Sequence, residues 1–244
     1  MSRFLLKISY DGTAYHGWQV QPNGITVQQV LCEKLKELTK ENIAVSGCSR
    51  TDAGVHANEF YCHFDVKHEL PISAFVKGLN AILPNDIAVL GCEKVSDDFH
   101  ARYNAKGKQY VYKFYDGDVP NPFLNKYTLS VPNKINDNLM AEFCTKIIGK
   151  YDFCGFSSSK RTVEDTVRTV TACEIERQGD VVCFKITADG FLYNMVRIIA
   201  GTALDVSNGK ISNEDIIDII NSKQRDRAGA TLPPHALFLN KVFY

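Results

Sequence analysis

One carboxylate stands out in the stretch SRTDAGVHA, residues 49–57, because its neighbours suit both a turn and a reaction. Asp52 follows Arg50 by two positions and enters the pair Ala53-Gly54. If the preceding strand continued this far, Arg50 and Asp52 would share a face, and the guanidinium would keep the carboxylate ionised and oriented. The same residues also suit a plain turn in which Asp52 bonds its own backbone. The local pattern alone favours the turn, so chemistry at Asp52 needs further support.

A second group of side chains, in KGKQYVYK (residues 106–113), suits contact with a nucleic acid. Period-2 alternation places Tyr110 and Tyr112 on one face of a strand. Aromatic rings interleaved with cations can stack on bases and meet phosphates. Alternating tyrosines more often pack a sheet, so both interpretations stand here. The nearby cations are Lys106, Lys108 and Lys113.

Three further stretches carry residues whose role the pattern leaves open. In FHAR, His100 and Arg102 either add positive character or belong to a solvated linker. In FLYNMVR, Arg197 lies inside an otherwise apolar helical stretch. It needs an anion in protein or substrate, unless its stem lies on apolar surface while its head reaches water. The stretch YDGTAYHGWQVQ holds the only tryptophan, Trp18, and equally suits an aromatic loop packed under its own sheet.

The composition is that of a soluble globular protein. Of 244 residues, 45% are hydrophobic and 23% charged, and the formal net charge is zero. A net charge of zero argues mildly against a protein that coats nucleic acid non-specifically, but it does not exclude a basic stripe on one face of the protein. The N-terminus shows no signal peptide, and no stretch approaches the roughly 18 apolar residues of a membrane span. We therefore expect a soluble cytoplasmic protein with no membrane contact.

The eight cysteines invite a disulfide or zinc interpretation, which their spacing does not support. No two are spaced as C-x-x-C, and none clusters with histidine at metal-ligand spacing. We expect no metal site, and thiols that act as small hydrophobes in a reducing compartment. The residues are Cys32, Cys48, Cys62, Cys92, Cys144, Cys154, Cys173 and Cys183.

Hydrophobic periodicity predicts strands and helices along the whole chain. Thr26 and Gln29 have the spacing of a capping box at the start of the first helix, and Gly149 is expected to end the third. The expected strands are 3–10, 43–48, 60–66, 87–95, 108–115, 167–177, 181–187 and 235–243. The expected helices are 26–39, 71–82, 137–149, 191–206 and 212–222.

The order of these elements predicts an α+β fold of two tandem ferredoxin-like halves. The elements up to residue 95 follow the order β-α-β-β-α-β, and the later elements are expected to repeat it. A boundary near residues 98–107 gives an N-terminal half, 1–100, that carries Asp52. The C-terminal half, 101–244, then carries Tyr110 and Arg197.

The motifs now reveal a resemblance that runs nearly end to end: the chain resembles the TruA family of tRNA pseudouridine synthases. RTDAGVHA after a strand is specific, and LNAILPNDIAV and FHARYNAKGKQYVY follow it in the right order. The other matching stretches are YDGTAYHGWQVQ near the start, YDFCGFSSS at 151–159, TVRTV at 166–170 and NMVRIIAG at 194–201.

The resemblance implies an isomerase that converts uridine to pseudouridine at anticodon-stem positions 38–40 of tRNA, without a cofactor. It implies two α/β halves around a central catalytic cleft, and a homodimer in which one tRNA contacts both subunits. By resemblance Asp52 is the covalent nucleophile, and Tyr110 is the active-site tyrosine that stacks on the base or acts as a general base. A cation is expected near an anionic nucleophile that RNA would repel. Arg50 fits by position, and Arg197 is a second candidate.

Some positions depart from the family pattern, and they leave the RNA target open. The departures are Ser49, Glu59, Phe60, Tyr61, Asn104 and the run Pro234-His235-Ala236-Leu237. None coincides with Asp52 or Tyr110, so the chemistry is expected to be retained. Fewer tRNA positions or another RNA remain alternatives. So does a non-catalytic RNA-binding module, although such a module gains nothing from an anion near phosphates.

Overall fold

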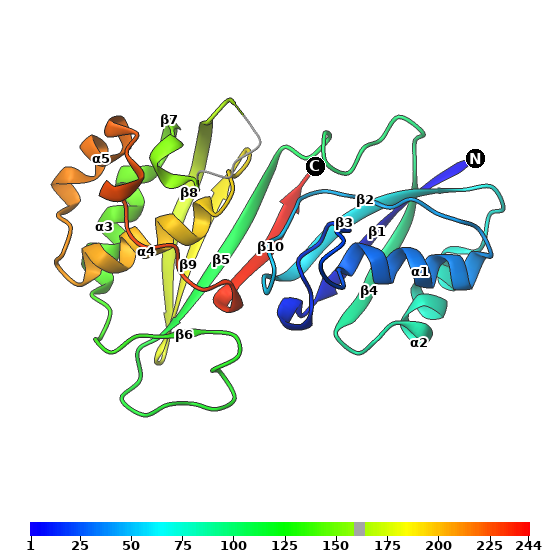
Figure 1. Ribbon diagram of the computed structural model, residues 1–244, viewed down its shortest axis with the longest axis horizontal. Coiled ribbons are helices and arrows are strands. Elements are labelled where there is room, and N and C mark those ends of the chain that lie inside the picture. Colours follow the sequence, from blue (N-terminus) through cyan, green and yellow to red (C-terminus); the bar gives the residue numbers. More distant parts are fainter. Residues whose placement is uncertain (159–163) are drawn as a thin grey trace. The chain divides into compact units, whose positions relative to one another are not determined.

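A computed structural model describes residues 1–158 and 164–244 and shows a mixed α+β protein (Figure 1). The predicted α+β class is therefore confirmed. The chain divides into two compact units. The first unit is Met1–Lys106 together with Phe238–Tyr244, and the second is Gly107–Leu237.

The sheet of the first unit is mainly antiparallel. Strand β1 pairs with β4 and with β3, both antiparallel. Strand β3 also pairs with β2 in antiparallel fashion, and its first residues pair in parallel with β10. The bounds are β1 Ser2–Tyr10, α1 Val27–Thr39, β2 Ser46–Gly47, β3 His56–Val66, α2 Leu79–Ile82, β4 Ile87–Val95 and β10 Leu237–Phe243. The order β-α-β-β-α-β up to residue 95 agrees with the prediction.

The core of the first unit follows from alternation on β3. Every second side chain on this strand is apolar, so one face of the sheet is buried. Phe75, in a π-helical turn before α2, packs on Phe64 and Phe4 with ring centroids 5.3 and 4.8 Å away. This contact places α2 on the buried face. The fully buried positions on β3 are Phe60, Cys62, Phe64 and Val66.

Helix α1 begins where the sequence predicts it. The Thr26 hydroxyl accepts a hydrogen bond from the Gln29 N–H at 3.3 Å. The Gln29 side chain donates to Glu33 at 3.0 Å instead of returning to Thr26, so only one half of the expected capping box forms. Lys40 closes the helix in the left-handed conformation.

The sheet of the second unit is mainly antiparallel, in the order β5-β9-β8-β7, and β6 pairs in parallel with β5 at its edge. Helices α3, α4 and α5 gather on one side of β5, β9 and β8 (Figure 1). The predicted hairpin across residues 178–180 is present, and Gly179 adopts a φ of 61° there. The bounds are β5 Gly107–Tyr115, β6 Leu129–Ser130, α3 Asp137–Ile147, β7 Gly149–Asp152, β8 Val167–Gln178, β9 Val181–Ala188, α4 Met195–Ser207 and α5 Ile216–Ser222.

The second unit differs from the expected repeat of the first. Its order is β-β-α-β-β-β-α-α, because β6 follows β5 and because β7 forms between α3 and the hairpin, where it pairs with β8. The last strand, β10, falls mostly within the first unit, although the predicted half 101–244 included it. The two differences have separate reasons: β7 has only four residues, too few for a clear alternation pattern, and β10 pairs with a strand far away in the chain.

Two expected elements of the first unit are shorter or less regular than predicted. The strand expected over 43–48 is reduced to Ser46–Gly47. The helix expected over 71–82 divides into the π-helical turn Ala74–Gly78 and α2, and Ile72 is exposed instead of lying on the buried face. A short apolar run is compatible with several local geometries, which is why its periodicity overestimates regular structure.

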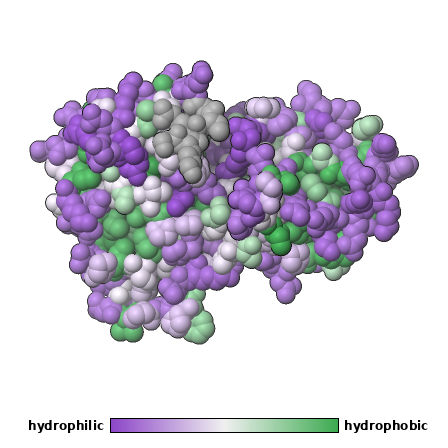
Figure 2. All heavy atoms as spheres, in the orientation of Figure 1, coloured by the Kyte–Doolittle hydropathy of each residue, from purple (hydrophilic) through white to green (hydrophobic). Residues whose placement is uncertain are grey.

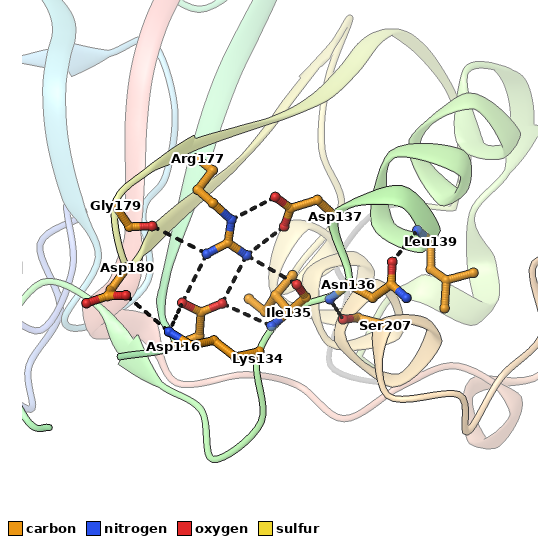
Figure 3. Close-up of polar contacts among 10 residues, drawn as sticks. All are labelled: Asp116, Lys134, Ile135, Asn136, Asp137, Leu139, Arg177, Gly179, Asp180 and Ser207. Carbon is orange, nitrogen blue, oxygen red and sulfur yellow. Dashed lines mark hydrogen bonds and ion pairs between the residues drawn. The ribbon is translucent and has the colours of Figure 1, made fainter. Parts of the chain in front are cut away.

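A network of ion pairs joins four segments of the second unit (Figure 3). The guanidinium of Arg177, on β8, donates hydrogen bonds to two carboxylates. Both N–O distances to Asp116 are 3.0 Å, and those to Asp137 are 2.6 and 2.7 Å. Lys134 contacts Asp116 at 3.7 Å and Asp180 at 3.1 Å. Since the Asp116 side chain is fully buried, its charge depends on these partners. The network therefore fastens the start of α3 to the sheet.

The loop between β5 and β6 carries apolar residues at its tip. Phe123 is 88% exposed and Val119 is 72% exposed. The face in Figure 2 is mostly hydrophilic, with hydrophobic atoms at the end of this loop. The base of the loop is fixed by the Tyr115 hydroxyl, which donates to the Val119 carbonyl at 2.7 Å. The tip itself contributes little to the core of the second unit.

Candidate active site

Asp52 lies in a turn between β2 and β3. The Val55 N–H donates to the Asp52 carbonyl at 3.1 Å and closes the turn. Gly54 has a φ of 78°, the left-handed conformation that a type II turn needs at its third position. Asp52 itself is half-buried. The stretch is therefore a turn, as the simpler interpretation holds, and the turn fixes the backbone that carries the carboxylate.

Arg50 lies on the same irregular segment but is exposed. Strand β2 ends at Gly47, so the alternation that would place Arg50 and Asp52 on one face does not reach them. Strand alternation therefore gives no support to a contact between Arg50 and Asp52, and a role for Arg50 beside Asp52 stays a prediction.

The segment 10–18 supports the Asp52 turn, which sequence reasoning missed. Trp18 N–H donates to the Thr51 carbonyl at 3.2 Å, and Gly54 N–H donates to the Tyr15 carbonyl at 3.3 Å. The hydroxyl groups of Tyr10 and Thr51 are hydrogen-bonded at 2.8 Å. From the sequence, packing of this aromatic stretch under its own sheet is one of the open interpretations. The available signal was a pair of closely spaced glycines in that stretch, which permit close backbone approach.

His56, the first residue of β3, is buried and ties the same two segments together. Its Nδ1 atom accepts the Gly12 N–H at 3.0 Å and lies 3.1 Å from a carboxylate oxygen of Asp11. Its ring stacks on Phe238 with centroids 4.6 Å apart. The histidine of the RTDAGVHA motif thus acts as an anchor in this fold. It holds segment 10–18 against the start of β3.

Tyr110 and Tyr112 are both buried on β5, in the second unit. Tyr110 meets Phe191 edge-on, with ring centroids 5.1 Å apart. The Tyr112 hydroxyl donates to the Pro233 carbonyl at 2.9 Å, and burial raises the pKa of that phenol. Tyr112 therefore follows the sheet-packing interpretation.

Arg197 lies on α4 and is half-buried. Its Nε donates to the Leu232 carbonyl at 2.6 Å, and its Nη1 donates to the Asn194 amide oxygen at 2.7 Å. Asn194 in turn donates to the Ser158 hydroxyl at 2.8 Å. These two acceptors are neutral groups, and they orient the guanidinium. An oriented cation of this kind suits an anionic ligand.

The FHAR stretch has a structural role in the first unit. The Ala101 N–H donates to His63 at 3.1 Å, and the rings of His63 and His100 lie 4.6 Å apart. Burial, helped by the neighbouring His100, lowers the pKa of His63 to about 4. Arg102 lies beside the exposed ring of Tyr103, 5.9 Å from its centroid. The linker interpretation fits Arg102, while His100 is packed.

The remaining predictions concern thiols, metals and membranes. All eight cysteines are free, and three of them, Cys48, Cys62 and Cys144, are buried. No group of three or more potential ligand side chains is placed to hold a metal ion in the part of the chain that the structure describes. None of the described helices has the length and apolarity to cross a membrane. Ser159, the last residue of the motif YDFCGFSSS, lies outside the described residues.

Comparisons with known proteins place the chain in a family. A family model described as tRNA pseudouridine synthase matches residues 7–104 and 143–244. The chain is 43% identical to tRNA pseudouridine synthase A 2 of Clostridium perfringens and 43% identical to tRNA pseudouridine synthase A of Acetivibrio thermocellus, with all of each chain covered. This chain belongs to the tRNA pseudouridine synthase family, as its motifs indicated.

Among solved structures, a Cbf5-Nop10-Gar1 complex matches 82% of this chain and 45% of that chain. The identity is 16% and the TM-score is 0.35, so no argument rests on this similarity.

Proposed function

We propose that this chain is an isomerase that converts uridine to pseudouridine in tRNA, with Asp52 as its covalent nucleophile. Two full-length relatives at 43% identity carry the name tRNA pseudouridine synthase. The observation that carries the assignment to Asp52 is its place on a closed, glycine-dependent turn within the matched range 7–104. A carboxylate held on such a turn is preorganised for attack.

The reaction needs a group that holds one fragment while the nucleoside is open. The bond between N1 and C1′ breaks, the uracil turns, and a bond between C5 and C1′ forms. The hydrogen leaves C5 and N1 gains a proton, so the product is an isomer of the substrate and no external oxidant or energy source is consumed. A carboxylate that adds to C6 of the base or to C1′ of the sugar can trap the intermediate. The target uridine must leave its stack to reach it.

Three more residues take substrate-binding roles in this proposal. Arg50 is exposed on the nucleophile segment and suits a phosphate near the reacting nucleotide. Tyr110 contributes its ring or its hydroxyl to the base, as the family resemblance implies. Arg197 offers a guanidinium oriented by Leu232 and Asn194 to an anionic group. The roles of the three residues are separable by substitution.

Release of tritium tests the reaction and the nucleophile together. Unmodified transcribed tRNA with tritium at C5 of uridine loses that label to water when C5 bonds to C1′. We expect release by the wild-type protein and none by Asp52→Asn, while tRNA binding is retained. Asp97→Asn is the matched control, because it makes the same change at an exposed site of the same unit. Activity of Asp52→Asn within a few-fold of wild type would remove Asp52 as nucleophile.

The proposed positions, 38–40 of the anticodon stem, are tested with transcripts in which only those uridines are replaced by cytidine. Loss of release from these transcripts supports the assignment, and unchanged release places the target elsewhere. Sedimentation of the protein with and without tRNA tests the homodimer. A protein that binds tRNA but releases no tritium from any transcript would instead be a non-catalytic RNA-binding module.

A further inference from the structure

The nucleophile turn is bracketed by hydrogen bonds from one distant segment. Residues 10–18 bond the turn before Asp52, through Thr51, and after it, through Gly54. The distances are 3.2 Å from Trp18 N to the Thr51 carbonyl and 3.3 Å from Gly54 N to the Tyr15 carbonyl. The backbone on both sides of Asp52 is therefore held from outside the motif.

Two glycines make this close approach feasible. A Cβ atom on Gly12 would lie 2.0 Å from the Val55 carbonyl oxygen. A Cβ atom on Gly17 would lie 2.4 Å from the Thr51 carbonyl oxygen, and Gly17 has a φ of 83°. These are backbone atoms that a side chain cannot push aside cheaply, so any larger residue would displace the turn.

One side-chain contact is added to these backbone contacts, at the residue next to Asp52. The hydroxyl groups of Tyr10 and Thr51 lie 2.8 Å apart, and both residues are buried. The Tyr10 ring is itself fixed, with its centroid 5.7 Å from Phe60 and 6.5 Å from Trp18. A hydroxyl on a fixed ring is thus joined to the residue that precedes Asp52. If either buried hydroxyl group were displaced, the hydrogen bond between them would be lost.

We infer that the Tyr10–Thr51 hydroxyl pair is a positioning device for the Asp52 carboxylate. The inference rests on the proposed role of Asp52 as nucleophile. Tyr10 and Thr51 act through the backbone of the turn and need no contact with the RNA. Displacement of a reacting group by near 1 Å can lower the reaction rate about 10²-fold. Loss of the hydroxyl pair should therefore slow the chemical step and leave the affinity for tRNA unchanged.

Single-turnover tritium release, with protein in excess over tRNA, separates the two effects. We expect Tyr10→Phe and Thr51→Val each to lower the rate constant about tenfold, with the dissociation constant for tRNA unchanged within twofold. Thr51→Ser retains the hydroxyl and should restore most of the rate. The double variant Tyr10→Phe/Thr51→Val should be no slower than either single variant, because both remove the same bond.

Tyr115→Phe is the matched control, since it removes a buried tyrosine hydroxyl in the second unit that bonds a carbonyl at 2.7 Å. It should leave the rate unchanged. If Tyr10→Phe fails to fold, the comparison of Thr51→Val with Thr51→Ser decides alone. Equal rates for those two variants, or wild-type rates for Tyr10→Phe, would overturn the positioning role while Asp52→Asn remains inactive. An active Asp52→Asn would instead overturn the proposed function itself.

Discussion

Asp116, whose side chain is fully buried, is held by both arms of the Arg177 guanidinium at 3.0 Å. The same guanidinium reaches Asp137 at the start of α3, and the Ile135 N–H donates to Asp116 at 3.0 Å (Figure 3). A buried carboxylate of this kind is stable only while its partners stay. The contact that fastens α3 to the sheet of the second unit therefore depends on the charges of Arg177 and Asp116.

Arg177→Ala should destabilise the second unit by about 3 kcal/mol, because it leaves the Asp116 carboxylate buried without its main partner. The measurement is hydrogen exchange of the β8 and β9 amides, which reports this unit even if the two units unfold separately. Lys134→Ala is the control: its side chain is 55% exposed and its ion pairs are longer, so it should lower the stability much less. Equal losses of stability in the two variants would contradict the view that Arg177 is the main partner of Asp116.

The same carboxylate predicts an acid-dependent loss of stability. Burial alone would raise the pKa of Asp116, but the Arg177 and Ile135 hydrogen bonds outweigh it and lower that pKa. A carboxyl whose pKa is lower in the folded state stabilises the fold above its unfolded pKa, about 3.9, and this contribution disappears as pH falls through the folded value.

We therefore expect the difference in free energy of unfolding between wild type and Asp116→Asn to be largest above about pH 4 and to shrink below it. Urea denaturation at a series of pH values measures this difference. A gap that stays constant down to pH 2 would show that Asp116 contributes through packing and not through its charge.

Local signals in the sequence predict much of this fold. Thr26 marks the start of α1, alternation from Phe60 marks β3, and Gly179 marks the hairpin between β8 and β9. Each of these signals acts over a few residues, where spacing alone determines which face is buried. The parallel pairing of β10 with β3 joins Phe238 to His56, and no local pattern carries such a pairing.

In the candidate site, too, the local sequence predicts some features, while others depend on contacts between residues far apart in the chain. The type of residue at Asp52 and its turn are readable from the motif. The support of that turn is not readable, because Tyr10 and Thr51 are 41 positions apart and meet only in the folded chain. The strand that would place Arg50 and Asp52 on one face does not reach them, because β2 ends at Gly47, three residues before Arg50.

Arg197 and Arg225 offer a matched test of binding against structure in the second unit. Arg225 donates to the Gly229 carbonyl at 2.9 Å and to the Thr231 hydroxyl at 3.0 Å. Arg197 donates to the Leu232 carbonyl at 2.6 Å. Both arginines thus fasten the segment 228–232, and of the two only Arg197 has a substrate-binding role in the proposed function.

Arg197→Ala should lower the rate of tritium release at least tenfold while shifting the melting temperature by only a few degrees, because its charge serves an anionic ligand as well as Leu232. Arg225→Ala should shift the melting temperature by a similar amount and leave the rate within about twofold of wild type. Arg197→Lys keeps the charge but cannot reach both Leu232 and Asn194, so it should recover only part of the rate. If the two alanine variants lose rate in equal proportion, Arg197 acts only by holding the segment that contains Leu232.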